Sequence, residues 1–255
     1  GLKMIRRANS IGHHYFIANL TSKDIASSVA LAVNEKHGIW YNPMTGKYHE
    51  ATISDKGIQL NLKSGESRIL ITSNKPVGEW KLGSKVKVNE KEAIAAADSK
   101  TIDLTENAWK LSFTEDAPKV GEIFNLKGVK SWEGLSEKAK VMMGTGVYET
   151  TIKLSKDDAK KQWTIDLGDV RESARVYVNN KYIGCAWAVP YILNCKDALN
   201  KGKNTIRIEV TNLPANRIAE MDRQGVKWRK MKEINVVDIN YKKTTYENWT
   251  PVPSG

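Results

Sequence analysis

Cysteine is scarce in this 255-residue chain, which contains only Cys185 and Cys195. Two cysteines are too few for a disulfide framework or a structural zinc site. Their ten-residue spacing leaves open whether they pair, because pairing requires their strands to be neighbours. Cys185 stands among apolar residues, which favours a buried and unreactive thiol.

Long apolar runs are also missing. None approaches the roughly 18 residues that a membrane-spanning helix needs, so no membrane span is expected. The first residues, Gly1-Leu2-Lys3-Met4, lack the basic-then-apolar layout of a secretion signal. The leading glycine predicts an excised piece of a longer protein.

Acidic residues are outnumbered by basic ones. The chain has 40 Lys and Arg against 29 Asp and Glu, a formal net charge of +11. This excess permits an acidic partner without naming one, and it is spread over both halves of the chain. Hydrophobic residues make up 40%, so a packed core is expected and a wholly disordered chain is excluded.

Short runs of alternating polar and apolar residues dominate the first 76 residues. This alternation is typical of strands with one buried face. The runs are residues 15–20, 28–33, 57–62 and 67–72. Turn signals such as Asn42-Pro43 and Ser64-Gly65 separate them. We therefore predict an incomplete β-sandwich over residues 1–76.

Residues 77–100 mix lysines with small residues and are predicted to be a linker. Alternation then resumes in longer runs, at residues 109–113, 147–154, 163–167, 174–178 and 205–210. Asn179-Asn180 predicts a hairpin turn with positive φ. Strands at this spacing, without helical periodicity, predict a jelly-roll β-sandwich over residues 101–255. The predicted fold class is all-β, with two domains.

Catalytic motifs are missing from the sequence. It has no glycine-rich phosphate loop and no Gly-x-Ser-x-Gly nucleophile motif. The adjacent His13 and His14 would point to opposite faces of a strand, so they cannot share one metal ion. Glu133 and Glu137 favour the solvated face of a short helix over a hydrolytic carboxylate pair. We expect no catalytic residue in this chain.

The sharpest charge feature is the basic stretch 223–232, with five cations around Trp228. Such a stretch can hold phosphates or acidic sugars. No nucleic-acid motif accompanies it, so a solvated loop with an inward-packed tryptophan is favoured and no nucleic-acid partner is expected.

The chain has eight tryptophans, and flat rings can stack on the apolar faces of sugars. Trp80, Trp109 and Trp163 fall on or near alternating runs, which favours core packing. Trp132 and Trp187 lie in loops or at strand ends, so they are better candidates for ligand contact.

One series of motifs resembles a known family. The series runs through Leu167-Gly168, Asn179-Asn180, Gly184-x-x-Trp187-x-x-Pro190-Tyr191, Gly202-x-Asn204, Val210-Thr211-Asn212 and Asn216-Arg217. It resembles the galactose-binding-like jelly roll called the sugar-binding domain of family 2 glycoside hydrolases. It resembles more closely the version at the C-terminus of family 106 α-L-rhamnosidases. Two departures are Asn180 in place of glycine and, after Ile218, Ala219-Glu220 in place of a Gly-Asp pair.

The first domain fits the same resemblance. Arg6-Arg7, residues 15–19 and residues 40–46 resemble the β-sandwich that follows the catalytic barrel in these rhamnosidases. The resemblance implies a non-catalytic C-terminal piece of an extracytoplasmic glycoside hydrolase that acts on plant polysaccharide. Its partners would be its own upstream catalytic domain and a carbohydrate, including an acidic one. No cofactor is implied, and no Asp cluster has the spacing of the structural calcium sites of such jelly rolls.

The candidate carbohydrate-binding residues are Trp187, Tyr191, Asn216, Arg217 and Trp132. The rings would stack on sugar, and the amide and guanidinium groups would hold hydroxyls or carboxylates. A packed cluster at a strand end is an equally good interpretation of Trp187 and Tyr191. A stand-alone carbohydrate-binding or adhesion module remains the alternative for the whole chain.

Overall fold

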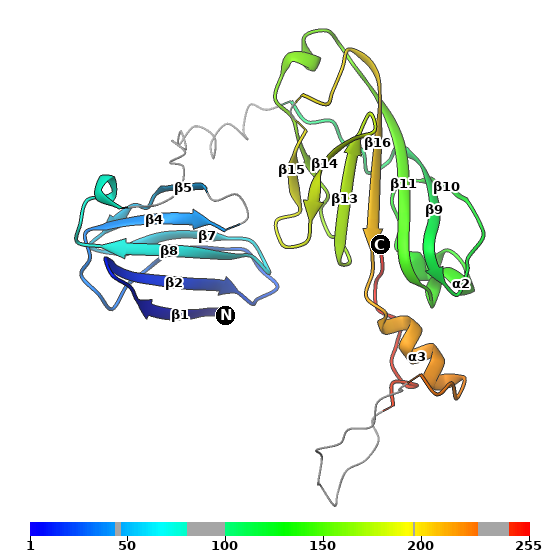
Figure 1. Cartoon of the computed structure of the whole chain (residues 1–255), viewed down its shortest axis with the longest axis horizontal. Coiled ribbons are helices and arrows are strands. Elements are labelled where there is room, and N and C mark those ends of the chain that lie inside the picture. Colours follow the sequence, from blue (N-terminus) through cyan, green and yellow to red (C-terminus); the bar gives the residue numbers. More distant parts are fainter. Residues whose placement is uncertain (44–46, 81–99, 196, 229–244) are drawn as a thin grey trace, which may run out of the picture. The chain divides into compact units, whose positions relative to one another are not determined.

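The computed structural model describes residues 1–43, 47–80, 100–195, 197–228 and 245–255. The chain divides into two compact units, Gly1–Ile102 and Asp103–Gly255, each described here by itself (Figure 1). Strands make up most of the regular structure of both units, which confirms the all-β fold class. No helix among the described residues is long and apolar enough to cross a membrane.

The first unit consists of two antiparallel sheets. One sheet has the strand order β1-β2-β8-β4-β5, and the other has the order β3-β7-β6 (Figure 1). The strands are β1 (Leu2–Ala8), β2 (Gly12–Asn19), β3 (Ile25–Val29), β4 (His37–Asn42), β5 (Lys47–Glu50), β6 (Ile53–Ser54), β7 (Gly57–Leu62) and β8 (Ser67–Ser73).

Side chains from both sheets form one core. Strand β7 buries Ile58, Leu60 and Leu62, while the residues between them are exposed. They pack with Tyr15 and Trp40 from the five-stranded sheet. Period-two burial on facing sheets is the packing of a β-sandwich, as the alternation predicted.

Two sequence predictions in this unit need correction at their edges. The strand predicted at residues 28–33 ends at Val29, because Leu31 and Val33 pack against the core from the following loop. In the predicted linker, Val77 and Trp80 are buried in the first unit, and the indole N–H of Trp80 donates to the carbonyl of Lys75 at 2.9 Å. Residues 81–99 lie outside the described part.

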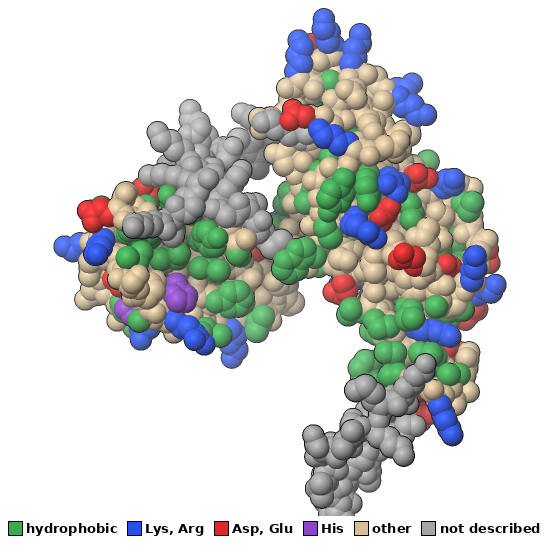
Figure 2. Space-filling view, in the orientation of Figure 1, with side chains coloured by type: hydrophobic (Ala, Val, Ile, Leu, Met, Phe, Trp, Pro, Cys, Tyr) green, Lys and Arg blue, Asp and Glu red, His purple; other side chains and the backbone are tan. Residues whose placement is uncertain are grey.

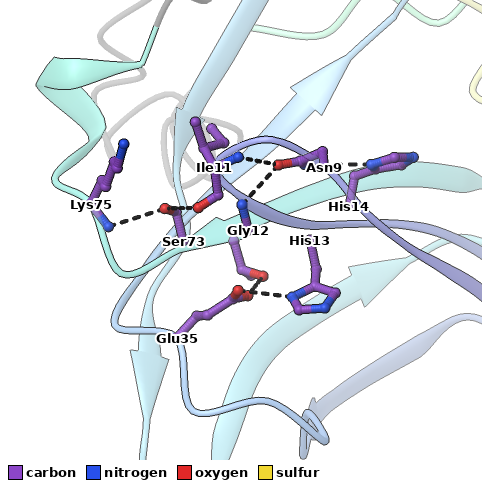
Figure 3. A network of polar contacts seen from close by, with 9 residues as sticks. Asn9, Ile11, Gly12, His13, His14, Glu35, Ser73 and Lys75 are labelled. Atoms are coloured by element: carbon purple, nitrogen blue, oxygen red, sulfur yellow. Dashed lines mark hydrogen bonds and ion pairs between the residues drawn. The ribbon is translucent and has the colours of Figure 1, made fainter.

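A polar network ties the turn before β2 to the loop before β4 (Figure 3). Asn9 Oδ1 accepts from the backbone N–H of Gly12 at 2.8 Å. His13 Nδ1 lies 2.8 Å from Glu35 Oε1, and Thr72 donates to the same carboxylate. His13 therefore has the structural, hydrogen-bonded environment expected from the sequence.

Replacing Gly12 with alanine is expected to lower the free energy of unfolding by about 1–2 kcal/mol. A Cβ atom there would lie 2.1 Å from the carbonyl oxygen of Thr72 and 2.9 Å from the Cα of Ser73, so β2 and β8 would have to separate. Urea denaturation followed by circular dichroism measures the effect. Gly78→Ala is the matched control, because its Cβ would meet nothing within 4 Å. Equal stability of the two variants would contradict the prediction.

The second unit is built on a six-stranded sheet with the order β10-β9-β11-β16-β13-β14, beside the pair β12-β15. The strands are β9 (Ala108–Ala117), β10 (Phe124–Lys127), β11 (Met143–Leu154), β12 (Thr164–Asp166), β13 (Ser173–Val178), β14 (Lys181–Ala186), β15 (Ile192–Asn194) and β16 (Gly202–Thr211). The helical segments are η3 (Trp132–Gly134), α2 (Glu137–Lys140), η4 (Asp158–Lys160) and α3 (Ala215–Arg223). In the described residues of the first unit there is one such turn, η1 (Val77–Glu79).

Local rules explain much of this unit. Asn179 and Asn180 join β13 to β14 with φ angles of 51° and 64°, which confirms the predicted hairpin turn. Cys185 and Cys195 are unpaired, and burial raises the pKa of the Cys195 thiol. Cys185 is only partly buried, so the sequence overstated its burial.

Candidate carbohydrate-binding site

The loops that carry the candidate residues leave the six-stranded sheet at one end. Thr211, at the end of β16, pairs with Thr145 near the start of β11 and with Ser173 at the start of β13. Ala186, at the end of β14, pairs with Ala174. The segments that follow β14 and β16 therefore begin at the same end of the sheet, although they lie apart in sequence. Loops gathered at one end of a sandwich are a common place for binding residues.

A C-terminal segment, residues 246–255, is bound at this same end. Asn216 on α3 donates to the carbonyl of Val252 and accepts from its N–H, both at 2.8 Å. The backbone N–H of Trp132 donates to the carbonyl of Ser254 at 2.9 Å. The backbone N–H of Arg171 donates to the carbonyl of Gly255 at 3.1 Å. Side chains and backbone from three separate segments thus fix the C-terminal segment.

Trp132 is a core residue. Its side chain is fully buried, and its indole N–H donates to the hydroxyl of Tyr148 at 2.7 Å. The ring of Phe113 meets it edge-on, with 5.1 Å between centroids. A sugar cannot stack on a ring with no exposed face, so the candidate role of Trp132 is corrected to a structural one. Its loop location misled the sequence analysis, because the covering residues lie more than a hundred positions later.

Asn216 is also structural. It is 4% exposed, and its amide group is occupied by the backbone of Val252. Because the side chain is buried and its amide is also bonded to Ser254, the amide is not accessible to a sugar hydroxyl. Asn216 therefore positions the C-terminal segment and the helix start beside Arg217.

Trp187 and Tyr191 have different environments. The Trp187 side chain is 58% exposed, so its ring is accessible for stacking. Tyr191 is partly buried and packs against the core of the second unit. Its desolvation, together with the negative charges of Glu172 and Asp169, raises the pKa of the Tyr191 hydroxyl. Tyr191 thus combines a packing role with a partly accessible ring.

Arg217 lines a cleft of about 640 Å³ between α2, α3 and the C-terminal segment. The rest of this cleft could not be predicted from the sequence, because its walls come from distant parts of the chain. The lining residues include Pro118, Lys138, Lys140, Arg223 and Pro251. Its volume falls within the usual range of ligand pockets.

The other charged features have structural partners. Glu133 accepts from Ser131, and Glu137 forms an ion pair with Lys140 at 3.7 Å. Trp228 in the basic stretch is partly buried, and its indole N–H donates to Asp222 at 2.8 Å. Residues 229–232 of that stretch lie outside the described part.

Within the described part, no group of three or more His, Cys, Asp and Glu side chains is placed to hold a metal ion.

Residues 135–252 match the family model described as "Glycosyl hydrolase 2 galactose-binding domain-like". The second unit contains a glycosyl hydrolase family 2 galactose-binding-like domain. This galactose-binding-like domain includes β11 to β16, α3 and four of the five candidate residues. The resemblance to family 2 sugar-binding domains is thereby confirmed, and the narrower one to family 106 stays a prediction.

Longer proteins contain regions similar to this chain. A "Putative beta-glucuronidase" of Formosa agariphila is 26% identical over 212 residues, which cover 76% of this chain and 18% of that protein. A rhamnosidase structure from Novosphingobium sp. PP1Y matches with a TM-score of 0.63 and 20% identity, over 100% of this chain and 23% of that one. A β-D-glucuronidase from Dictyoglomus thermophilum matches 42% of this chain, at 15% identity and a TM-score of 0.37. The chain spans about a fifth of the length of these relatives.

Proposed function

We propose that this chain is the non-catalytic C-terminal part of an extracytoplasmic glycoside hydrolase similar to α-L-rhamnosidases. In this proposal it supports the catalytic part and contacts plant polysaccharide through the sheet end of the galactose-binding-like domain. The observation that carries the proposal is the exposed ring of Trp187 at the edge of that domain.

The sheet end has the chemistry that sugar recognition needs. Sugar rings have apolar faces that stack on flat side chains and hydroxyls that require hydrogen bonds. Trp187 supplies an accessible ring, and Tyr191 a second, partly buried one. Arg217 supplies donors in the lining of the cleft. The similarity to the Novosphingobium rhamnosidase and to the Formosa agariphila putative β-glucuronidase supports a sugar as the ligand class.

Replacing Trp187 with alanine is expected to weaken polysaccharide binding about thirtyfold, a loss of about 2 kcal/mol for a central aromatic contact. The unfolding temperature should hardly change, because the ring is 58% exposed. Isothermal calorimetry with a rhamnogalacturonan measures the affinity. Tyr182→Ala is the matched control, since Tyr182 is 55% exposed on the same strand as Ala186 but at its other end. Equal affinities of the two variants would contradict the assignment of Trp187.

The non-catalytic part of the proposal has a direct test. The chain is incubated with an aryl α-L-rhamnoside and an aryl β-glucuronide, and the release of the aryl group is followed by absorbance. We expect no release above the uncatalysed rate. Turnover that rises in proportion to the concentration of this chain would contradict the proposal.

A further inference from the structure

The cleft beside Arg217 carries an excess of positive charge. Four cations line it, namely Lys138, Lys140, Arg217 and Arg223, against the two carboxylates Glu137 and Glu220. Both carboxylates already have cationic partners. Glu137 lies 3.7 Å from Lys140, and Glu220 lies 2.8 Å from Arg223.

Two of the four cations are left for a ligand. Arg223 also donates to the carbonyls of Glu247 and Trp249, at 3.2 and 3.4 Å. By contrast, the side chains of Lys138 and Arg217 form no hydrogen bond or ion pair in the described part, and Arg217 has only a longer-range attraction to the charge of Glu220. These two residues stand on different helices, 79 positions apart in sequence, and line the same cleft.

The walls of the cleft are held in place. Ser136 caps α2 by accepting from the N–H of Ala139 at 3.2 Å. Asn216 fixes the start of α3 to Val252, one residue after the lining residue Pro251. A fixed frame reduces the entropic cost of holding long basic side chains against a ligand.

The unpaired cations decide which group a ligand must have. A guanidinium donates two parallel hydrogen bonds to a carboxylate or sulfate group, and an ammonium adds a second charge-assisted contact. The lining also contains Gln224 and the two ion-paired carboxylates, which can form hydrogen bonds with sugar hydroxyl groups. An anionic sugar satisfies both sets of groups, whereas a neutral sugar offers the two cations no opposite charge.

We propose that this cleft binds the oxyanion of an acidic sugar, with Arg217 and Lys138 as its ligands. The inference rests on the proposed function, because it names the substrate class contacted by the same end of the domain. Uronate carboxylates and sulfate esters share this chemistry, and the experiment separates the two.

The test is calorimetry of the full chain with polygalacturonate, dextran sulfate and carboxyl-reduced polygalacturonate. Lys138→Gln and Arg217→Gln should each raise the Kd for the preferred acidic polymer about tenfold. Lys138 is exposed, so its variant is expected to keep the native fold. Lys153→Gln is the matched control, because Lys153 is an exposed cation on β11 that does not line the cleft.

The outcomes separate this inference from the proposed function. A selective loss with polygalacturonate assigns the site to carboxylates, and the same loss only with dextran sulfate assigns it to sulfates. Equal effects of Lys138→Gln, Arg217→Gln and Lys153→Gln would show non-specific charge attraction and overturn the inference. Tight binding of the carboxyl-reduced polymer that still depends on Trp187 would overturn it as well, while leaving the proposed function intact.

Discussion

Replacing Trp132 with alanine is expected to lower the free energy of unfolding by about 3–5 kcal/mol, the usual cost of deleting a buried tryptophan. The side chain is fully buried among Phe113, Tyr148 and the C-terminal segment. Its loss leaves a cavity and removes the indole N–H that donates to the Tyr148 hydroxyl, which itself donates to the carbonyl of Lys130. The unfolding of the second unit, followed by denaturant titration, should shift to much lower urea concentration.

Two comparison variants make this result specific. Trp132→Phe keeps most of the ring volume and loses the N–H, so about 1–2 kcal/mol of destabilisation is expected. Trp187→Ala removes an exposed ring and should leave stability nearly unchanged. If Trp132→Ala were as stable as Trp187→Ala, the burial of Trp132 under the C-terminal segment would be refuted.

The stability of the second unit is expected to fall between about pH 10 and pH 12 because of Tyr148. Burial raises the pKa of Tyr148 to about 12, while the hydrogen bond from Trp132 opposes that rise. In the unfolded chain a tyrosine loses its proton near pH 10. Above that pH the unfolded state binds fewer protons than the folded state, so the free energy of unfolding decreases. Two pKa units correspond to about 2–3 kcal/mol.

The measurement is urea denaturation at several pH values between 9 and 12, for the unaltered chain and for Tyr148→Phe. Other tyrosines and lysines titrate in both proteins, so the difference between the two stability curves isolates Tyr148. The free energy of unfolding of the unaltered chain minus that of Tyr148→Phe should decrease between about pH 10 and pH 12. Parallel curves would mean that Tyr148 titrates alike in the folded and unfolded chain.

Local sequence patterns were sufficient for most of the fold. The alternation in residues 57–62 gives β7 with its exact burial pattern, and Asn179-Asn180 gives the hairpin after β13. Both depend on side-chain period and backbone φ preference, which act between near neighbours. The extension of a strand beyond Val29 was wrong, because Leu31 and Val33 fill the core without pairing.

The candidate site depended on contacts that no local pattern encodes. The loop neighbours of Trp132 suggested exposure, yet Ser254 and Gly255 bind over it from the far end of the sequence. The cleft was equally unpredictable, since Lys138 and Arg217 line it together although they lie 79 positions apart in the sequence. The exposure of Trp187 was easier to predict, because this residue directly follows the last residue of β14.

Calorimetric titration of the unaltered chain with rhamnogalacturonan, polygalacturonate and a neutral polysaccharide tests the central proposal most directly. A glycan-contacting domain predicts saturable heat with at least one acidic polymer, and the affinity should fall about thirtyfold in the Trp187→Ala variant. Absence of saturable heat with every polymer would contradict the proposed glycan contact.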